Sequence, residues 1–274
     1  MPKANTSWGQ NFLIDPAVTN QILPFINPDS KDIFLEIGPG KGAITKQLAN
    51  RADTTHAVEI DRELSKKLKR LEDEKKYYLH NKSILDFDPR EIFTNKVRVI
   101  GNLPYNLSTP IMFWSFKYLA NFCDMHFMLQ KEFGDRLIAK NDNKDFGRIT
   151  VITQYLTKPE YCFLILPESF SPKPKVESVF IKFNPIVGRS IDDPISIKLP
   201  EVTRIAFMHK RKMVGKSLEK IISSEELADL GIDRKCRPEN ISVEDYIKIS
   251  GALLWCQIML SETCKVVIAS CSAC

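Results

Sequence analysis

The stretch at residues 101–106, Gly-Asn-Leu-Pro-Tyr-Asn, holds side chains suited to binding a flat ring that carries an amino group. The side-chain oxygen of Asn102 and a backbone carbonyl near Pro104 can each accept one hydrogen from an exocyclic amino group. Tyr105 can lie against the face of the ring, where stacking contributes ~1–3 kcal/mol per base. These residue types predict a site for a neutral ring such as adenine. Taken alone, the motif fits equally well with a polar turn that closes a strand.

The residues before this stretch predict the element that positions it. Val-Arg-Val-Ile at 97–100 is typical of a buried strand, and Pro104 ends it because proline lacks the backbone N–H that a sheet ladder needs. Asn102 would then lie just past the carboxyl end of the strand. Open α/β sheets bind their ligands at that edge.

A second strand, turn and helix predict a nucleotide site at the same edge. An apolar run at 33–37 leads into a turn with Gly38 and Gly40, and residues 43–48 follow as a helix. Glycines let the backbone pass close to a ligand where a Cβ atom would clash. We therefore expect Gly38 and Gly40 to contact a cofactor.

The glycine turn leaves two cofactors open. Gly38, Gly40 and Ala43 satisfy the dinucleotide fingerprint of nicotinamide enzymes. Glu36, two residues before the first glycine, and the additional Gly42 are typical of S-adenosylmethionine sites instead. A phosphate-binding P-loop is excluded, because the lysine of this turn is followed by glycine rather than by serine or threonine.

A carboxylate follows the glycine turn at the spacing of a ribose ligand. Glu59 stands near the end of a predicted strand at 55–60, seventeen residues after Gly42. At that strand tip it can accept hydrogen bonds from both ribose hydroxyls of an adenosine. The alternative role, an acid that caps the next helix, suits Asp61 better.

Composition permits a nucleic-acid partner and predicts no metal site. The 274 residues carry 39 basic and 34 acidic side chains, a formal net charge of +5. Such a mild excess is compatible with a polyanion but does not require one. The seven cysteines are an odd number and argue against a disulfide framework, and none of the four histidines has ligand spacing with a cysteine. Neither a targeting segment nor an apolar run of the ~18 residues needed for a membrane helix is recognised, so we expect a cytoplasmic protein.

Two segments concentrate basic residues. Residues 170–175, Phe-Ser-Pro-Lys-Pro-Lys, predict an extended loop stiffened by proline. Residues 201–222 predict a basic amphipathic helix whose exposed side carries His-Lys-Arg-Lys at 209–212. Between strands and helix, residues 185–200 hold three prolines and no clear periodicity, which predicts a linker.

With these pieces in place, the chain resembles the KsgA-type rRNA adenine dimethyltransferases. Matching stretches occur in order over roughly residues 8 to 250. They are residues 9–13, 36–42, 59–61, 101–110, 128–132, 170–178, 211–212 with 217–218, and 237–242. The antibiotic-resistance enzymes that methylate large-subunit rRNA share the first half. Leu103 and residues 237–242 are more similar to the small-subunit branch.

The resemblance implies a fold and a reaction. The fold would be α/β, a Rossmann-like seven-stranded methyltransferase sheet with its last strand antiparallel, plus a small all-helical C-terminal domain. S-adenosylmethionine would be the methyl donor. The substrate would be two adjacent adenosines in a hairpin near the 3′ end of small-subunit rRNA, each dimethylated at the amino nitrogen. The partner would be the immature small ribosomal subunit, and we expect a monomer. The expected divisions are a catalytic domain at 1–184, an rRNA-recognition domain at 185–250 and a tail of unknown role at 251–274.

The resemblance also implies roles for individual residues. Besides Gly40 of the glycine turn, the cofactor-binding positions would be Asn11, Leu13, Gly38, Glu59, Ser83 and Asn102. Phe170 would stack opposite Tyr105, and together with Asn102 and Pro104 these form the predicted catalytic group. The cations predicted to meet RNA phosphates are Lys173, Lys175, Lys210, Arg211 and Lys212. For the last three, a solvated helix face is the alternative.

This chain departs from the family pattern at three places. Ser83 stands where the family has an aspartate that contacts the cofactor adenine; the nearby Asp86 could supply that carboxylate instead. Phe146 replaces a tyrosine. Residues 251–274 have no recognised counterpart.

Three other functions are compatible with parts of the sequence. A non-catalytic ribosome-assembly factor could keep the fold, but its adenine motif would be expected to decay, and Asn102 to Tyr105 are intact. A large-subunit methyltransferase of the resistance type and a nicotinamide-dependent oxidoreductase are the remaining alternatives.

Overall fold

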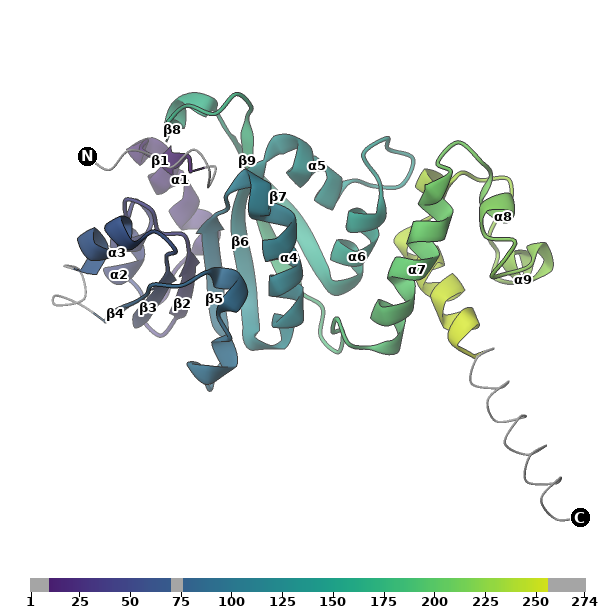
Figure 1. The fold of residues 1–274 in the computed structure, drawn as a ribbon, viewed down its shortest axis with the longest axis horizontal. Helices are drawn as coiled ribbons and strands as arrows, with labels where there is room; N and C mark the ends of the chain where they lie inside the picture. Colours follow the sequence, from purple (N-terminus) through teal and green to yellow (C-terminus); the bar gives the residue numbers. More distant parts are fainter. Residues whose placement is uncertain (1–9, 70–75, 256–274) are drawn as a thin grey trace, which may run out of the picture. The chain divides into compact units, whose positions relative to one another are not determined.

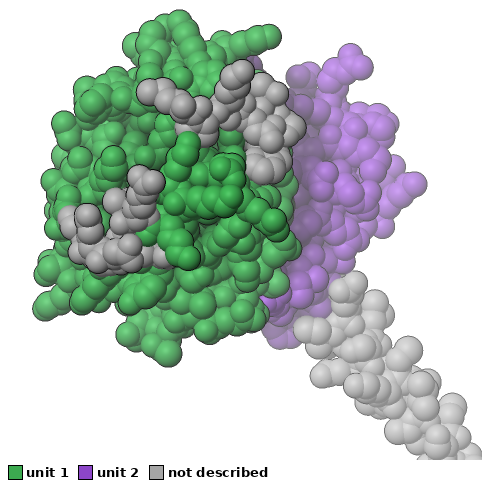
Figure 2. Space-filling view, turned by 60° about the vertical axis from the view of Figure 1, so that its left-hand side comes forward, with its two compact units in different colours: residues 1–135, 157–188 green, residues 136–156, 189–274 purple. Residues whose placement is uncertain are grey.

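The computed structural model describes residues 10–69 and 76–255, which fall into two compact units. Unit 1 comprises residues 1–135 and 157–188, and unit 2 comprises residues 136–156 and 189–274 (Figure 2). The units differ from the predicted division at residue 184, because the excursion at 136–156 packs with the C-terminal segment. Within unit 2, the rings of Phe146 and Phe207 lie 6.4 Å apart, and the Tyr155 hydroxyl donates to the Asp193 carboxylate at 2.9 Å.

Unit 1 is built on a seven-stranded sheet in the order β4-β3-β2-β5-β6-β9-β7 (Figure 1). The strands are β2 (Ile33–Ile37), β3 (Thr54–Val58), β4 (Tyr77–His80), β5 (Val97–Asn102), β6 (Phe122–Gln130), β7 (Thr157–Ile165) and β9 (Ser178–Pro185). Strands β2 to β6 are parallel, and β9 runs antiparallel to both β6 and β7. The predicted α/β sheet of seven strands with an antiparallel last strand is confirmed.

The helices of this part of the chain follow the strands they connect. They are α1 (Pro16–Ile26), α2 (Thr45–Ala49), α3 (Arg62–Leu68), α4 (Ser108–Lys117) and α5 (Lys131–Ile138), the last of which crosses the boundary between the units. Helix α1 begins as the sequence predicts. The Asp15 carboxylate accepts from Ala17 N at 2.9 Å, and Pro16 occupies the first position, where its missing N–H costs nothing.

Apolar residues from α1, α2, five strands of the sheet and both strands of a short ribbon form one core cluster under the site. Ile22 and Ile26 of α1 meet Phe34 of β2, Ile100 of β5 and Phe180 of β9, all 1% exposed or less. Fully burying an aliphatic or aromatic side chain of this kind stabilises a fold by ~1.5–3 kcal/mol. This core holds the carboxyl ends of the central strands in fixed positions.

A short two-stranded ribbon joins distant parts of unit 1. β1 (Phe12–Leu13) pairs antiparallel with β8 (Phe170–Ser171), so that Phe12 lies opposite Ser171. The ribbon places the segment before α1 beside the proline-rich loop that begins at Phe170. The sequence did not predict this pairing, because two-residue strands carry no periodicity.

Unit 2 is helical in its described part. It contains α6 (Arg148–Leu156), α7 (Pro194–Met208), α8 (Val214–Ser217), α9 (Ser224–Asp229) and a helix at 243–255. Two predictions need correction. The supposed linker contains the first half of α7, because Asp193 caps the helix and Pro194 takes its first position. The supposed continuous helix at 201–222 is broken after Met208. The four residues at 209–212 are polar, so a helix continued through them would have no apolar side chain to bury. The chain turns instead, and Val214 becomes fully buried.

The C-terminal tail is only partly described. Residues 251–255 continue the last helix, and Trp255 is 69% exposed. The rest of the predicted tail, 256–274, lies outside the described residues. Among the described helices, none is both long enough and apolar enough to span a membrane.

Candidate functional site

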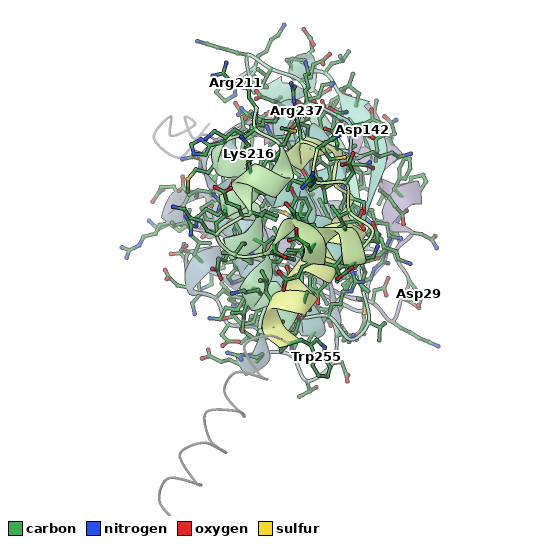
Figure 3. The ribbon with its side chains drawn as sticks, turned by 90° about the vertical axis from the view of Figure 1, so that its right-hand side faces the viewer. Asp29, Asp142, Arg211, Lys216, Arg237 and Trp255 are labelled. Atoms are coloured by element: carbon green, nitrogen blue, oxygen red, sulfur yellow. The ribbon has the colours of Figure 1, made fainter. Side chains whose placement is uncertain are left out.

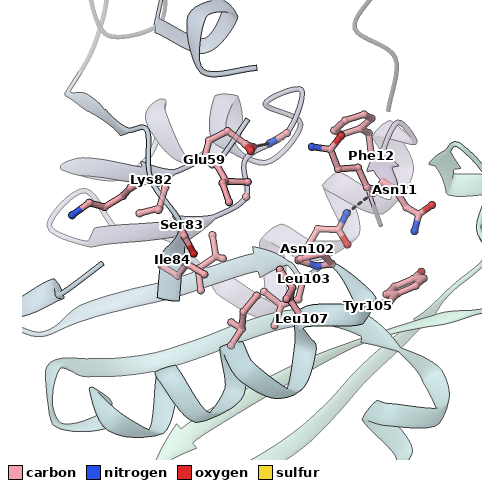
Figure 4. Close-up of a pocket in the computed structure, with 18 residues that line it drawn as sticks. Asn11, Phe12, Glu59, Lys82, Ser83, Ile84, Asn102, Leu103, Tyr105 and Leu107 are labelled. Atoms are coloured by element: carbon pink, nitrogen blue, oxygen red, sulfur yellow. Dashed lines mark hydrogen bonds between the residues drawn. The ribbon is translucent and has the colours of Figure 1, made fainter. Parts of the chain in front are cut away.

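A cleft opens at the carboxyl ends of β2, β3 and β5 (Figure 4). The loops after these strands contribute Gly38 and Gly40, Glu59, and Asn102 to Tyr105, and the turn after β4 adds Ser83. Residues 10–12 close the opposite side. The structure therefore brings most of the residues predicted for cofactor and acceptor, though neither Leu13 nor Phe170, to the lining of one cavity.

Asn102 is held in one orientation by the N-terminal segment. Its amide nitrogen donates to the backbone carbonyl of Asn11 at 2.7 Å, the dashed contact in Figure 4. The assignment of amide nitrogen and oxygen follows from this bond, since a carbonyl can only accept. The Asn102 oxygen consequently points away from Asn11 and is available as an acceptor.

The carbonyl of Pro104 is already engaged by its own chain. It accepts from Leu107 N at 2.9 Å and from the Ser108 hydroxyl at 3.2 Å. A carbonyl oxygen has two lone pairs, so both are used. Leu103 is buried and lines the same cleft. Its carbonyl is therefore a better candidate than that of Pro104 for the predicted backbone acceptor.

Tyr105 lines the cleft beside Asn102 (Figure 4). Its hydroxyl shares a 2.7 Å hydrogen bond with the hydroxyl of Ser178 at the start of β9. Burial raises the pKa of the Tyr105 phenol, and the Ser178 bond offsets part of that shift. The ring is therefore neutral at physiological pH and suited to stacking against another ring.

Glu59 is placed at the tip of β3, as the sequence predicts. The side chain is 4% exposed, and its two oxygens accept from Gly40 N at 3.2 Å and from Asp61 N at 2.9 Å. Burial raises the pKa of Glu59, while these backbone donors lower it in part. The Asn81 amide donates to the Glu59 carbonyl at 2.8 Å and thereby ties this strand end to the turn after β4. Asn81 was not predicted from the sequence, because no local pattern indicates that its side chain bonds to the Glu59 carbonyl.

A smaller pocket adjoins the glycine turn and is lined by Glu36, Gly38, Gly40, Lys41 and Asn102, among others. Glu36 is 2% exposed and accepts from the Thr45 hydroxyl at 2.6 Å. Burial raises the pKa of Glu36 to about 7, with the Thr45 hydrogen bond opposing the shift. A buried carboxylate of this kind is suited to a cationic ligand group.

Phe12 was not singled out from the sequence, yet it shapes the glycine turn. Gly40 has a positive φ of 59°, and a Cβ atom built there would lie 2.9 Å from the Phe12 ring. The Lys41 ammonium lies 4.8 Å from the centre of the same ring. Leu13 packs into the core cluster and lines the smaller pocket.

Ser83 lines the cleft, and its hydroxyl accepts from Leu85 N at 3.2 Å as the cap of a short helical turn at Ile84–Asp86. Asp86 is exposed and is not among the described residues that line the cleft. The contact between Ser83 and a cofactor adenine stays a prediction.

Phe170 is not among the described residues that line the cleft. It is 3% exposed, belongs to the core cluster and pairs with Leu13 in the β1–β8 ribbon. The strand alternation turns its ring toward the core because that face is apolar. Among the described residues that line the cleft, Phe170 is therefore not present as the predicted stacking partner of Tyr105.

The predicted RNA-binding cations are all exposed and lie in two places. In unit 1, Lys173 and Lys175 follow β8, and Lys173 pairs with Glu168. In unit 2, the cationic turn, defined as Lys210, Arg211 and Lys212, follows α7 (Figure 3). Lys210 donates to the Lys144 carbonyl at 2.7 Å.

The segment after the cationic turn is hydrogen-bonded to a second basic segment of unit 2. Val214 N donates to the Cys236 carbonyl at 2.7 Å, and Gly215 N donates to the Arg234 carbonyl at 3.0 Å. Arg237, which follows this second segment, is shown in Figure 3 with Arg211. Basic residues far apart in the sequence therefore contribute to this part of unit 2.

Comparison with known proteins decides the family. The family model described as ribosomal RNA adenine dimethylase matches residues 1–253. The chain belongs to this family. Its members are enzymes, and this match covers both units of the fold.

Curated relatives agree with the family assignment. A "Ribosomal RNA small subunit methyltransferase A" from Dechloromonas aromatica is 40% identical over 250 residues, covering 91% of this chain and 98% of the relative. A protein of the same name from Legionella pneumophila is 41% identical over 244 residues, covering 89% and 95%. The matches cover nearly the full length of both relatives.

Solved structures support the fold. A dimethyladenosine transferase from Plasmodium falciparum matches with a TM-score of 0.76 and 23% identity, over 87% of this chain and 95% of its own. The 23S rRNA methyltransferase ErmE matches with a TM-score of 0.73 and 21% identity, over 89% and 99%. At this level of identity the likeness carries the methyltransferase fold alone.

Proposed function

We propose that this chain uses S-adenosylmethionine to dimethylate the amino nitrogens of two adjacent adenosines in a 3′-terminal hairpin of small-subunit rRNA. The observation that carries the proposal is the orientation of Asn102. Its amide nitrogen is committed to the Asn11 carbonyl, so its oxygen is available to an incoming amino group. The names of the curated relatives support the small-subunit substrate.

The residues of the cleft fit the proposed cofactor. Glu59 can accept from ribose hydroxyls, Gly40 lets the backbone approach the ligand, and Glu36 in the adjoining pocket suits an ammonium group. Asn11, Leu13, Gly38 and Ser83 complete the proposed binding set. When bound, S-adenosylmethionine supplies a methyl group activated by a sulfonium centre.

The acceptor side of the cleft overcomes the weakness of the nucleophile. The lone pair of an adenine amino nitrogen is delocalised into the ring, which makes that nitrogen a poor nucleophile. By accepting its two hydrogens, the Asn102 oxygen and the Leu103 carbonyl favour a lone pair localised on the nitrogen. Tyr105 holds the ring plane by stacking. No carboxylate base is needed, since the methylated ammonium is acidic enough to release its proton to solvent.

Orientation contributes most of the remaining acceleration. Well-aligned reacting groups reach effective molarities of ~10⁵–10⁸ M. The bonds that hold Asn102 and the Glu59 strand end are made by backbone carbonyls and N–H groups, which move little. These residues would therefore hold both reactants in line without further rearrangement of the cleft.

The adenosine must leave its stack to reach this cleft, which costs least in a hairpin loop. Lys173, Lys175 and the cationic turn are the proposed phosphate contacts. Phe170 lies in the core cluster and is omitted from the proposed stacking group. The substrate implies a cytoplasmic protein, and light scattering of the purified chain should give the mass of a monomer.

The proposed function is tested by methyl transfer to immature small subunits that lack the modification. With labelled S-adenosylmethionine, we expect two methyl groups on each of two adjacent adenosines, located by mass spectrometry of RNA fragments. Large subunits serve as the comparison. Methylation of large subunits alone would favour the resistance-type enzyme, and binding without transfer would favour an assembly factor. Calorimetry with NAD in parallel tests the oxidoreductase alternative, for which NAD and not S-adenosylmethionine should bind.

A further inference from the structure

The tyrosine of the acceptor motif is tied to a strand on the antiparallel side of the sheet. The hydroxyls of Tyr105 and Ser178 lie 2.7 Å apart, a normal O–H···O distance. Seventy-three positions separate the two residues in the chain. Because Tyr105 lines the cleft, this bond connects β9 directly to the place where a base would stack.

Ser178 is a rigid anchor. It is the first residue of β9, where it lies opposite Gln130 of β6 and Ile165 of β7. Its backbone is therefore held from both sides, and only 1% of the residue is exposed. A hydroxyl in such a position has little freedom to move.

Tyr105, by contrast, stands on a loop. It begins a single helical turn, Tyr105–Leu107, directly after the proline that ends the acceptor motif. Loop residues are generally more mobile than the elements they connect. Stacking on a base requires a fixed ring plane, and the hydrogen bond to Ser178 ties the far end of this ring to β9.

We propose that Ser178 is a positioning residue for methyl transfer, because its hydroxyl holds the Tyr105 ring in the plane against which the target adenine stacks. This inference rests on the proposed function. It also gives one segment two roles. Residues 170–178 carry Lys173 and Lys175, the proposed phosphate contacts, and end on the serine that fixes the ring. Capture of the RNA backbone and alignment of the base would then use one segment.

The first test compares Ser178→Ala with Tyr105→Phe and with the double variant in methyl transfer to small subunits. Either single change removes the same hydrogen bond, and we expect kcat to fall roughly two- to tenfold. The double variant should lose no more than the weaker single variant, because one bond cannot be lost twice. Ser178→Ala should leave the affinity for S-adenosylhomocysteine unchanged in calorimetry.

Ser115→Ala is the matched control. Ser115 is also buried, and its hydroxyl donates to the Ile111 carbonyl at 2.9 Å within α4. It therefore measures the effect of removing a buried serine hydroxyl elsewhere in unit 1. Its kcat should equal that of the wild type, and thermal unfolding of all variants identifies any that fail to fold.

A second readout does not depend on catalysis. An rRNA hairpin with 2-aminopurine at the target position should gain fluorescence when the base leaves its stack, and stacking of the bound base on the Tyr105 ring should quench part of that gain. We expect weaker quenching with Ser178→Ala and normal quenching with Ser115→Ala. If a folded Ser178→Ala variant matches the control in both kcat and quenching, or if the effects of the two single changes multiply, Ser178 does not position the ring. An inactive wild type would instead overturn the proposed function.

Discussion

The cleft of unit 1 and the cationic turn of unit 2 are built in opposite ways. The polar groups of the cleft come from strand ends far apart in the sequence, and each is held by hydrogen bonds to the chain, as Asn102 is by Asn11 and Glu59 by Gly40 and Asp61. The cationic turn consists of three consecutive residues that are all exposed.

This difference determines how each region tolerates change. In the proposed mechanism the cleft aligns the two reactants, so a displaced polar group would reduce the alignment that supplies most of the rate. On an exposed cationic turn, each charge adds a similar increment, which salt screens. We therefore expect abrupt effects of substitution in the cleft and graded effects in the turn.

Asn102→Ala should give the largest effect. It removes the only side-chain acceptor proposed for the amino group, and we expect turnover on small subunits to fall ~10²-fold or more. Asn106→Ala, an exposed residue of the same loop, is the control and should retain full activity. Circular dichroism should show both variants folded. Turnover of Asn102→Ala close to that of the wild type would contradict the assignment of this residue.

Replacing Lys210, Arg211 and Lys212 together by Gln should weaken RNA binding by about tenfold at moderate salt. Each lost phosphate contact should also flatten the slope of log affinity against log salt by up to roughly 0.7–0.9. Cofactor affinity should not change. The control replaces Lys66, Lys67 and Lys69, exposed cations at and just after α3, with the same loss of charge. An equal change of slope in both triple variants would mean that the cationic turn is only a solvated face.

Glu36 should make cofactor binding pH-dependent. Its pKa of about 7 in the free protein means that it is largely protonated at pH 6. A bound ammonium group favours the carboxylate, so binding below pH 7 releases a proton and affinity should rise with pH until Glu36 is ionised. We expect S-adenosylhomocysteine to bind about three- to tenfold more tightly at pH 8 than at pH 6. Most of this dependence should disappear in Glu36→Gln, whereas an unchanged pH profile would show that Glu36 does not face the ligand's charge.

Ser83→Asp should have the smallest effect and the opposite sign. A carboxylate accepts a hydrogen bond worth ~1.5–3 kcal/mol, against ~0.5–1.5 kcal/mol for a neutral hydroxyl. We expect S-adenosylmethionine to bind about fivefold more tightly by calorimetry. Aspartate can also preserve the cap on the turn at Ile84–Asp86. Asp86→Ala should change nothing; if it weakens binding and Ser83→Asp does not strengthen it, the carboxylate comes from Asp86.

Local signals in the sequence were sufficient to predict three adjacent strands of the sheet and several residues that line the cleft. β2 has the bounds that its apolar pattern indicates, and β3 and β5 differ from theirs by at most two residues at either end. Asp15 with Pro16 marks the start of α1. The glycine turn, Glu59 and the residues around Asn102 could be placed at one edge, because the carboxyl ends of parallel strands meet there. The family resemblance added the antiparallel last strand.

Tertiary structure alone decided the features that depend on residues far apart in the chain. These include the packing of residues 136–156 in unit 2, the β1–β8 ribbon, the core position of Phe170 and the bonds from Asn81 to the Glu59 carbonyl and from Tyr105 to Ser178. None of them leaves a periodic or capping signal, because each depends on a partner far away in the chain. The sequence by itself determined which groups could do the chemistry. Which of them meet, and which turn into the core instead, depended on the burial of apolar faces and the pairing of distant polar atoms.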